Sequence, residues 1–181
     1  MRFLVALVVC AGSLFAGAGE LSGRRAPGFA LPDSQIRYHD LQDYRGRIVI
    51  LEFMQTNCPH CATLGEILEK VKAKYPGKVS VLAIVNPPSN QTTVGQYIAG
   101  HKLTYPILFD CGQMAGSYLA VNGNTSVTVP HIFIIDAQGT IAYDYGYDVL
   151  NRDIFEGNGL FTLIDRMLAG GGGAGAAAKK K

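Results

Sequence analysis

A C-P-H-C motif at residues 58–61 lies between a run of apolar residues, 48–54, and a segment with helical periodicity, 62–75. Cysteines three positions apart at the start of a helix lie one turn apart, close enough to form a disulfide. The first of them, Cys58, occupies a position where free backbone N–H groups and the helix dipole favour an anion, so its thiol should ionise more readily than that of a free cysteine. A strand, a CxxC motif and a helix in this order indicate a redox dithiol. Thiol–disulfide exchange is therefore the leading hypothesis.

The amino-terminal residues have the pattern of a secretory signal. Met1-Arg2 precede the apolar run 3–15, and the small residues 16–18 follow it. This pattern predicts a signal peptide at residues 1–18, cleaved after Ala18, and a protein that is periplasmic or otherwise exported. The alternative is an uncleaved anchor, but a run of this length is too short to span a hydrocarbon core of about 30 Å. No later apolar stretch is long enough for a membrane helix.

The cysteine count suits redox chemistry in an exported protein. An exported location permits disulfides. Of the 4 cysteines, Cys10 lies within the predicted signal, which leaves Cys58, Cys61 and Cys111 in the mature chain. An odd number argues against a purely structural disulfide framework and leaves one thiol over.

The charge of the chain gives no support to nucleic-acid binding. Of the 16 basic residues, four are Arg2 and the three terminal lysines, so the remaining 12 face 14 acidic residues. The body carries no basic patch interleaved with aromatic residues, so a nucleic-acid partner is not expected. The Gly- and Ala-rich residues 170–181, which end in the lysines, cannot bury a core and are interpreted as a flexible tail. The sequence does not indicate whether this tail is native.

The body alternates apolar runs with segments of helical periodicity. Strands are expected at 47–53, 79–85, 106–109, 127–136 and 140–145, helices at 59–75, 91–101, 113–121 and 160–168, a turn at 122–124 and an irregular lead-in at 24–46. Alternating strands and helices that finish in a hairpin and a helix predict an α/β domain around a mixed sheet. The length and the one dominant apolar pattern favour a single domain.

Four motifs resemble those of one protein family. They are APGFAL at 26–31, the approach to the dithiol at 43–53, CPHC at 58–61, and Val129-Pro130 leading FIIDAQG at 133–139. Together they make the chain resemble the thioredoxin superfamily, and within it the exported TlpA/ResA-like (AhpC/TSA-redoxin) thiol–disulfide oxidoreductases.

The resemblance implies a fold and a mode of action. The fold is an α/β thioredoxin fold, in which helices flank a central mixed β-sheet, with an N-terminal extension and a βα insertion before a cis-proline. We accordingly expect a thioredoxin-like domain at residues 19–169 that acts as a monomer without a cofactor. Its substrates would be cysteine-containing exported proteins, and electrons would pass to or from a membrane redox partner.

The motif and the scaffold indicate opposite directions of electron flow. The Pro59-His60 pair is that of the oxidant DsbA, whereas the interval from Cys61 to Pro130 suits the TlpA/ResA-like branch, many of whose members are reductases. The tryptophan-rich approach to the dithiol is absent, since the chain has 0 tryptophans. The sequence therefore leaves open whether the protein is a reductase or an oxidase.

The motif assigns a role to each of its reactive residues. Cys58, at the more exposed N-terminal place on the helix, is the expected nucleophile, and Cys61 is the expected resolving cysteine. A purely structural disulfide is disfavoured, because a bridge that closes so short a loop constrains the unfolded chain little. A protonated His60 would favour the Cys58 thiolate and make the disulfide more oxidising, although the residue could equally be a solvated histidine.

Three further residues are candidates for the site. Glu52, the one charged residue in its strand, should have a raised pKa in apolar surroundings and could exchange a proton with Cys61 through water. The alternative is a solvated acid at a sheet edge. By resemblance, Pro130 is the cis-proline opposite the dithiol, and Val129 presents its backbone to a substrate peptide.

Two residues and two other functions stay open. Cys111 is expected to be a small buried residue after a strand, or else a second resolving cysteine. His131 is expected near the dithiol, or as a partly buried strand residue. The same cysteines with His60 and His131 could bind or deliver copper, although no metal site is predicted. A peroxiredoxin-like peroxidase is disfavoured because Gln55 stands where a threonine is needed, and a redox-inert binding domain is the third alternative.

Overall fold

The computed structural model of this protein describes residues 21–121 and 128–170. The predicted signal peptide at 1–18, the turn expected at 122–124 and the tail beyond residue 170 lie outside the described residues. In the part that is described, no helix combines the length and the apolar character that crossing a membrane requires.

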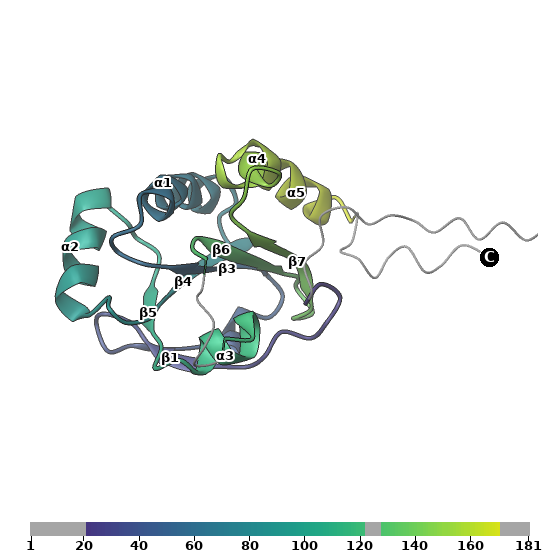
Figure 1. Cartoon of the computed structure of the whole chain (residues 1–181). Helices are drawn as coiled ribbons and strands as arrows, with labels where there is room; N and C mark the ends of the chain where they lie inside the picture. The colour runs from purple at the N-terminus through teal and green to yellow at the C-terminus, as the bar shows by residue number, and fades with distance from the viewer. Residues whose placement is uncertain (1–20, 122–127, 171–181) are drawn as a thin grey trace, which may run out of the picture.

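A five-stranded mixed sheet forms the centre of the molecule (Figure 1). In spatial order its strands are β5 (Ile107–Phe109), β4 (Val79–Val85), β3 (Ile48–Met54), β6 (His131–Ile135) and β7 (Ile141–Gly146). The first three run parallel to one another, and the last two pair in antiparallel fashion. The central strand β3 is buried along its whole length, as expected for a continuous apolar run covered on both faces. The predicted α/β class with a mixed sheet is confirmed.

Helices cover one face of the sheet. They are α1 (Pro59–Lys74), α2 (Gln91–His101), α4 (Arg152–Phe155) and α5 (Asn158–Leu168). In Figure 1, α1, α4 and α5 lie above the sheet and α2 lies beside its β5 edge. Their apolar side chains form one core cluster with Ile48, Ile50 and Met54 of β3.

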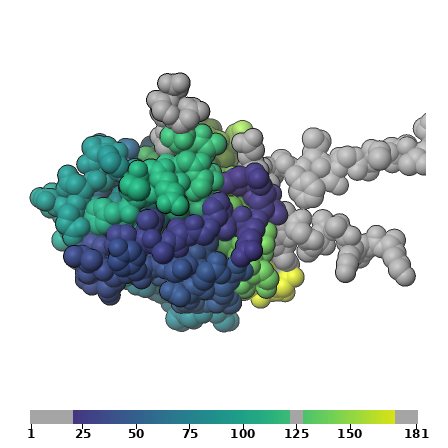
Figure 2. Space-filling model, turned by 90° about the horizontal axis from the view of Figure 1, so that it is seen from below, coloured from purple at the N-terminus to yellow at the C-terminus, as the bar shows by residue number. Residues whose placement is uncertain are grey.

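The opposite face carries a second cluster. It contains Val49, Leu51 and Phe53 of β3 together with side chains of α3 (Gln113–Leu119) and of the N-terminal segment. Figure 2 shows α3 and the N-terminal segment side by side on this face. Because side chains alternate along a strand, Glu52 lies on the α1 face with Ile50 and Met54.

The expectation of an irregular lead-in at 24–46 is wrong in part. This segment contains strands β1 (Ala30–Pro32) and β2 (Tyr38–Asp40), which pair as an antiparallel hairpin, and the short 3₁₀ helix η1 (Leu41–Tyr44). Strands of three residues are too short to display a period of two. The buried carboxylate of Asp33 organises the turn between them.

Asp33, directly after β1, accepts hydrogen bonds from residues of the turn and of β2. They come from the amides of Gln35 (2.8 Å) and Arg37 (3.0 Å), the Arg37 Nε (2.9 Å) and the His39 Nε2 (3.1 Å). Burial would raise the pKa of Asp33, but these hydrogen bonds hold it well below its ordinary value. The charged carboxylate is therefore a structural centre of the hairpin.

Candidate active site

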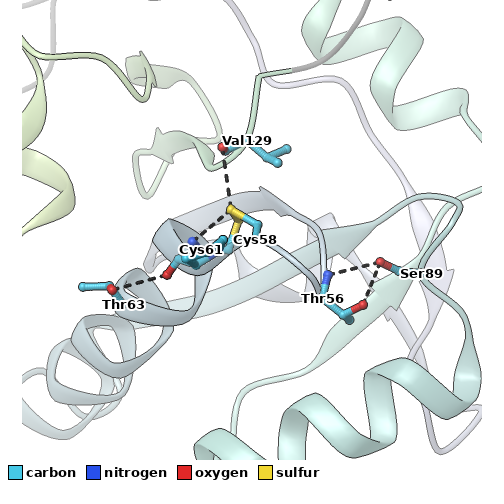
Figure 3. The surroundings of a disulfide bond; sticks show 7 residues. Thr56, Cys58, Cys61, Thr63, Ser89 and Val129 are labelled. Atoms are coloured by element: carbon cyan, nitrogen blue, oxygen red, sulfur yellow. Dashed lines mark hydrogen bonds between the residues drawn. A yellow bond between two sulfur atoms is a disulfide. The ribbon is translucent and has the colours of Figure 1, made fainter.

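The two cysteines of the motif form a disulfide at the start of α1, directly after the carboxyl end of β3 (Figure 3). Cys58 is the N-cap residue of the helix and Pro59 its first residue, as the sequence predicts. The Cα atoms of Cys58 and Cys61 are 5.2 Å apart, and the Cys61 amide donates a hydrogen bond to the Cys58 Sγ over 3.1 Å. The same amide would stabilise a thiolate at Cys58 after reduction.

The two sulfurs differ in accessibility. Cys61 is fully buried in the core cluster beneath α1, with 0% of its surface exposed. Cys58 is only partly buried and lies between exposed neighbours, Asn57 and Pro59. A reagent or a substrate sulfur can therefore reach Cys58 and not Cys61.

The segment before β6 lies across from the disulfide. The carbonyl oxygen of Val129 is 3.8 Å from the Cys58 Sγ, as Figure 3 shows. A disulfide sulfur carries no hydrogen, so this approach is a contact, whereas a reduced Cys58 thiol could donate to the same oxygen. The Val129–Pro130 peptide is cis, as the resemblance implied. The fold thus brings Val129 and Pro130 to the dithiol from 71 positions away.

His60 is exposed and contacts the segment that follows β7. Its ring stacks on that of Tyr147, with 4.2 Å between the centroids. The Tyr147 amide donates to the Pro130 carbonyl over 3.1 Å, which connects this segment to the cis-proline. In the sequence Tyr143, Tyr145 and Tyr147 alternate, a pattern that packing on one side of a strand explains, so it gives no signal for this contact.

Glu52 is buried beneath α1, so the alternative of a solvated acid is wrong. Only 1% of its surface is exposed, and its partners across the strand ladders are Ala83 and Ile132, both apolar. Burial raises the pKa of Glu52 to about 8. It lies on the face of the sheet that also holds the Cys61 sulfur.

His131 belongs to the other face. It alternates with Ile132 along β6, and its ring stacks on that of Phe133 in the second core cluster. Its Nε2 lies 2.6 Å from the Oδ1 of Asp144 on β7. Of the two positions expected for His131, the structure shows the partly buried strand residue. Across residues 21–121 and 128–170, no three His, Cys, Asp or Glu side chains are grouped so that they could hold a metal ion.

The prediction that Cys111 is buried is wrong. Its side chain is exposed, and it follows Asp110, which is buried in its place. The Oδ2 of Asp110 accepts hydrogen bonds from the amides of Met114 (3.0 Å) and Ala115 (3.3 Å) in the first turn of α3. The buried side chain after β5 is therefore the Asp110 carboxylate, which pairs with free amides at the helix start, and not the Cys111 thiol.

Cys111 lines a cavity of about 420 Å³, and neither cysteine of the dithiol is among its lining residues. Val129 and Phe53 line it as well, and so does Pro87, whose bond to Pro88 is also cis. The loop that contains Pro87 is joined to the approach to the motif, since the Thr56 amide donates to the Ser89 Oγ over 3.2 Å (Figure 3). The run of proline, asparagine and serine at residues 86–90 predicts this loop from the sequence.

Comparison with known proteins identifies the family. The model of the AhpC/TSA family matches residues 22–144. The chain belongs to this family. Among curated relatives of this AhpC/TSA protein, the thioredoxin-like protein YneN of Bacillus subtilis is 28% identical over 125 residues, which span 68% of this chain and 70% of YneN. The thiol-disulfide oxidoreductase ResA of Geobacillus thermodenitrificans is 29% identical over 119 residues, which span 66% of each chain.

Solved structures share the fold of this AhpC/TSA protein. A putative thiol:disulfide interchange protein DsbE from Chlorobium tepidum superposes with a TM-score of 0.63 at 24% identity, covering 78% of this chain and 97% of its own. A secreted disulfide oxidoreductase of Mycobacterium tuberculosis gives 0.58 at 19% identity, covering 72% and 92%. The predicted thioredoxin-like fold and the predicted class, thiol–disulfide oxidoreductase, are confirmed.

Proposed function

We propose that this protein exchanges disulfides with cysteine-containing proteins outside the cytoplasm, with Cys58 as the nucleophile and Cys61 as the resolving cysteine. One observation carries the proposal. A disulfide at a helix start joins a reachable sulfur to a fully buried one, with the Val129 carbonyl 3.8 Å from the reachable sulfur. A structural disulfide does not need this asymmetry, whereas an exchange reaction does.

The exchange takes place in two balanced steps. In the reducing direction the Cys58 thiolate attacks a substrate disulfide, one Cys58–substrate bond forms, and the substrate's other sulfur leaves as a thiolate that takes up a proton. The Cys61 thiolate then attacks the Cys58 sulfur, which restores the Cys58–Cys61 disulfide and releases the second substrate thiolate. Two electrons pass from the dithiol to the substrate. In the oxidising direction the same steps run in reverse.

Other residues of the site serve these steps. Glu52 would accept the Cys61 proton before the second step and return it in the reverse direction, because a carboxyl whose pKa is near the working pH can do both. A protonated His60, on the exposed side of the motif, would stabilise the Cys58 thiolate. The backbone of Val129 and Pro130 would align a substrate strand beside Cys58.

The finer parts of the proposal concern location and partners. The predicted signal peptide at residues 1–18 supports an exported protein with a folded body at 19–169 and a flexible tail at 170–181, and a relative of similar fold is described as secreted. A monomer that exchanges electrons with a membrane redox partner fits an oxidoreductase without a cofactor. The direction of electron flow stays open. The Pro59-His60 pair is that of an oxidant, whereas the rest of the domain resembles ResA and its relatives.

The reduction potential of the Cys58–Cys61 pair, equilibrated against glutathione, tests the function and its direction together. A value near about −120 mV would identify an oxidant and one near about −270 mV a reductase. A pair that never equilibrates would overturn the proposal in favour of a structural or metal-binding role.

Two variants test the assigned roles of the cysteines. Cys61→Ser should accumulate a covalent mixed disulfide with a disulfide-bonded test protein, visible on a non-reducing gel. Cys58→Ser should form none. Cys111→Ser is the matched control, and it should exchange at the wild-type rate.

A further inference from the structure

Two buried tyrosine hydroxyls lie beneath α1, in the same region of the core as Glu52. Tyr97 of α2 and Tyr105, which precedes β5, point their hydroxyl groups into the core, with 6% and 3% of their surfaces exposed. Within the described residues, neither hydroxyl has a hydrogen-bond partner, and neither do the two carboxyl oxygens of Glu52. Buried polar groups are nearly always paired, and a small internal water is the usual partner when no side chain is.

Gly65 places the two hydroxyls close together. A Cβ atom on this residue would lie 3.1 Å from the Tyr105 Oη and 3.6 Å from the Tyr97 Oη. Gly65 lies one turn beyond Cys61 on the buried face of α1. The absence of a side chain at Gly65 therefore leaves room for these two hydroxyls one helical turn beyond Cys61.

Glu52 faces the same region. It lies on the α1 face of β3, and besides burial its charge is what raises the pKa of both Tyr97 and Tyr105. Glu66 of α1 also raises the pKa of Tyr97, and Tyr97 and Glu69 of α1 also raise the pKa of Tyr105. Burial is what raises the pKa of Glu52, and within the described residues no side chain is hydrogen-bonded to its carboxyl oxygens.

The position of Tyr105 is fixed by α1 itself. The Glu69 carboxylate accepts hydrogen bonds from the amides of Thr104 and Tyr105, the latter over 3.3 Å, and the Lys72 Nζ donates to the Thr104 carbonyl over 2.9 Å. The helix that carries the dithiol thus also holds the segment that places a hydroxyl next to Gly65. Glu69 and Lys72 thus hold the backbone around Tyr105 more firmly than the packing of an apolar ring requires.

We propose that Glu52, Tyr97 and Tyr105 enclose a buried water site, and that the two tyrosines are positioning residues which hold the water connecting the Glu52 carboxyl with Cys61. The proposal rests on the proposed function for the proton exchange between Glu52 and Cys61. The hydroxyls, donating through the water, would stabilise the Glu52 carboxylate and offset part of the effect of burial.

The test is a ¹³C NMR titration of the Glu52 carboxyl in the oxidised full-length protein. Tyr97→Phe and Tyr105→Phe should each raise the midpoint by about one pH unit, because each removes a donor to the carboxylate. Gly65→Ala, which puts a methyl group where the hydroxyls meet, should shift it in the same direction. Tyr118→Phe is the matched control, since Tyr118 is equally buried but lies on the opposite face, donating to the Pro27 carbonyl over 2.6 Å.

The exchange kinetics give a second readout. The pH midpoint for resolution of the mixed disulfide should move upward in the two tyrosine variants by the amount seen in the titration. A Glu52 midpoint that stays at the wild-type value in both variants, or moves no more than in Tyr118→Phe, overturns the inference. Failure of the proposed function would look different, since wild-type protein would then exchange no disulfides while the titration still reported on the tyrosines.

Discussion

The imidazole of His60 stacks on the phenol ring of Tyr147 with 4.2 Å between the ring centroids. Tyr147 also packs edge-to-face against Phe155 of α4, and its amide is hydrogen-bonded to the Pro130 carbonyl. An aromatic face attracts a cation placed over it. The stack therefore fixes where the charge of a protonated His60 lies relative to Cys58.

This contact predicts an effect on the redox pair. Tyr147→Leu keeps part of the contact with Phe155 but removes the aromatic ring on which His60 stacks. A protonated His60 is then held less firmly near Cys58, so the reduced form of the dithiol should be less stabilised. The reduction potential should become more negative by about 10–20 mV, which corresponds to an electrostatic effect of up to about 1 kcal/mol. Equilibration with glutathione measures it.

A double-mutant cycle identifies the cause. His60→Ala should shift the potential in the same direction, and adding Tyr147→Leu should then change little, because the two residues act through one contact. Tyr143→Leu, a tyrosine that stacks on Tyr145 instead, should leave the potential unchanged. Additive shifts from His60 and Tyr147 would contradict the coupling.

The burial of Glu52 should make stability depend on pH. Its pKa rises from 4.5 to about 8 on folding, so the folded protein holds this proton more tightly than the unfolded chain does. The stability linked to Glu52 is fully present below about pH 4.5 and is lost as pH rises towards about 8. Between these limits the loss amounts to about 4–5 kcal/mol, and Glu52→Gln should remove it.

Urea unfolding of the oxidised proteins between pH 5 and 8 measures this difference. As the pH rises, the free energy of unfolding of the wild type should fall relative to that of Glu52→Gln. Parallel curves for the two proteins would show that Glu52 is not buried as described. Asp33 does not disturb the comparison, because its lowered pKa lies below this range.

Cys58, Cys61 and Cys111 should differ in their reaction with iodoacetamide. In the native oxidised protein Cys111 should be modified without denaturant, because it is exposed. After reduction Cys58 should react at least about ten times faster than Cys61, which is fully buried. Mass spectrometry of the digested protein measures each site, and preferential labelling of Cys61 would contradict the assigned roles.

The N-terminal hairpin should depend on the charge of Asp33. Asp33→Asn removes the charge and replaces one of the two accepting oxygens with an NH2 group, which cannot accept, so it should lower the free energy of unfolding at pH 7 by about 1–3 kcal/mol. Because its folded pKa lies below the unfolded value, this contribution is present above about pH 4 and disappears as the pH falls further. The exposed Asp43→Asn is the control, and equal losses in both variants would refute the prediction.

Where the chain has long periodic segments, the sequence predicted them closely. The strand at 79–85 and the helix at 91–101 have the expected bounds, and β3 differs from its prediction by one residue at each end. Their apolar residues recur over two or more helical turns or strand repeats, so the pattern that packs into the core also identifies the type of element. The hairpin β1–β2 escaped prediction because each of its strands has three residues.

The candidate site was predictable only where a motif marks it. The disulfide, the buried Glu52 and the cis bond before Pro130 follow from residues at known places in the motifs. The position of Tyr147 over His60, and of Tyr97 and Tyr105 near Glu52, depends on segments that only the folded chain brings together. A tyrosine at a core position has the same local pattern whether its hydroxyl meets solvent, a water or a carboxyl.

The burial of Cys61 has a consequence for the search for partners. Since only Cys58 can be approached, a protein that gives electrons to this chain and a protein that takes them from it must both be joined to the same sulfur. A single bait that lacks Cys61 would therefore capture upstream and downstream partners alike. Because the same bond forms with both kinds of partner, the direction of electron flow is then read from the reduction potential of each captured partner relative to that of the Cys58–Cys61 pair.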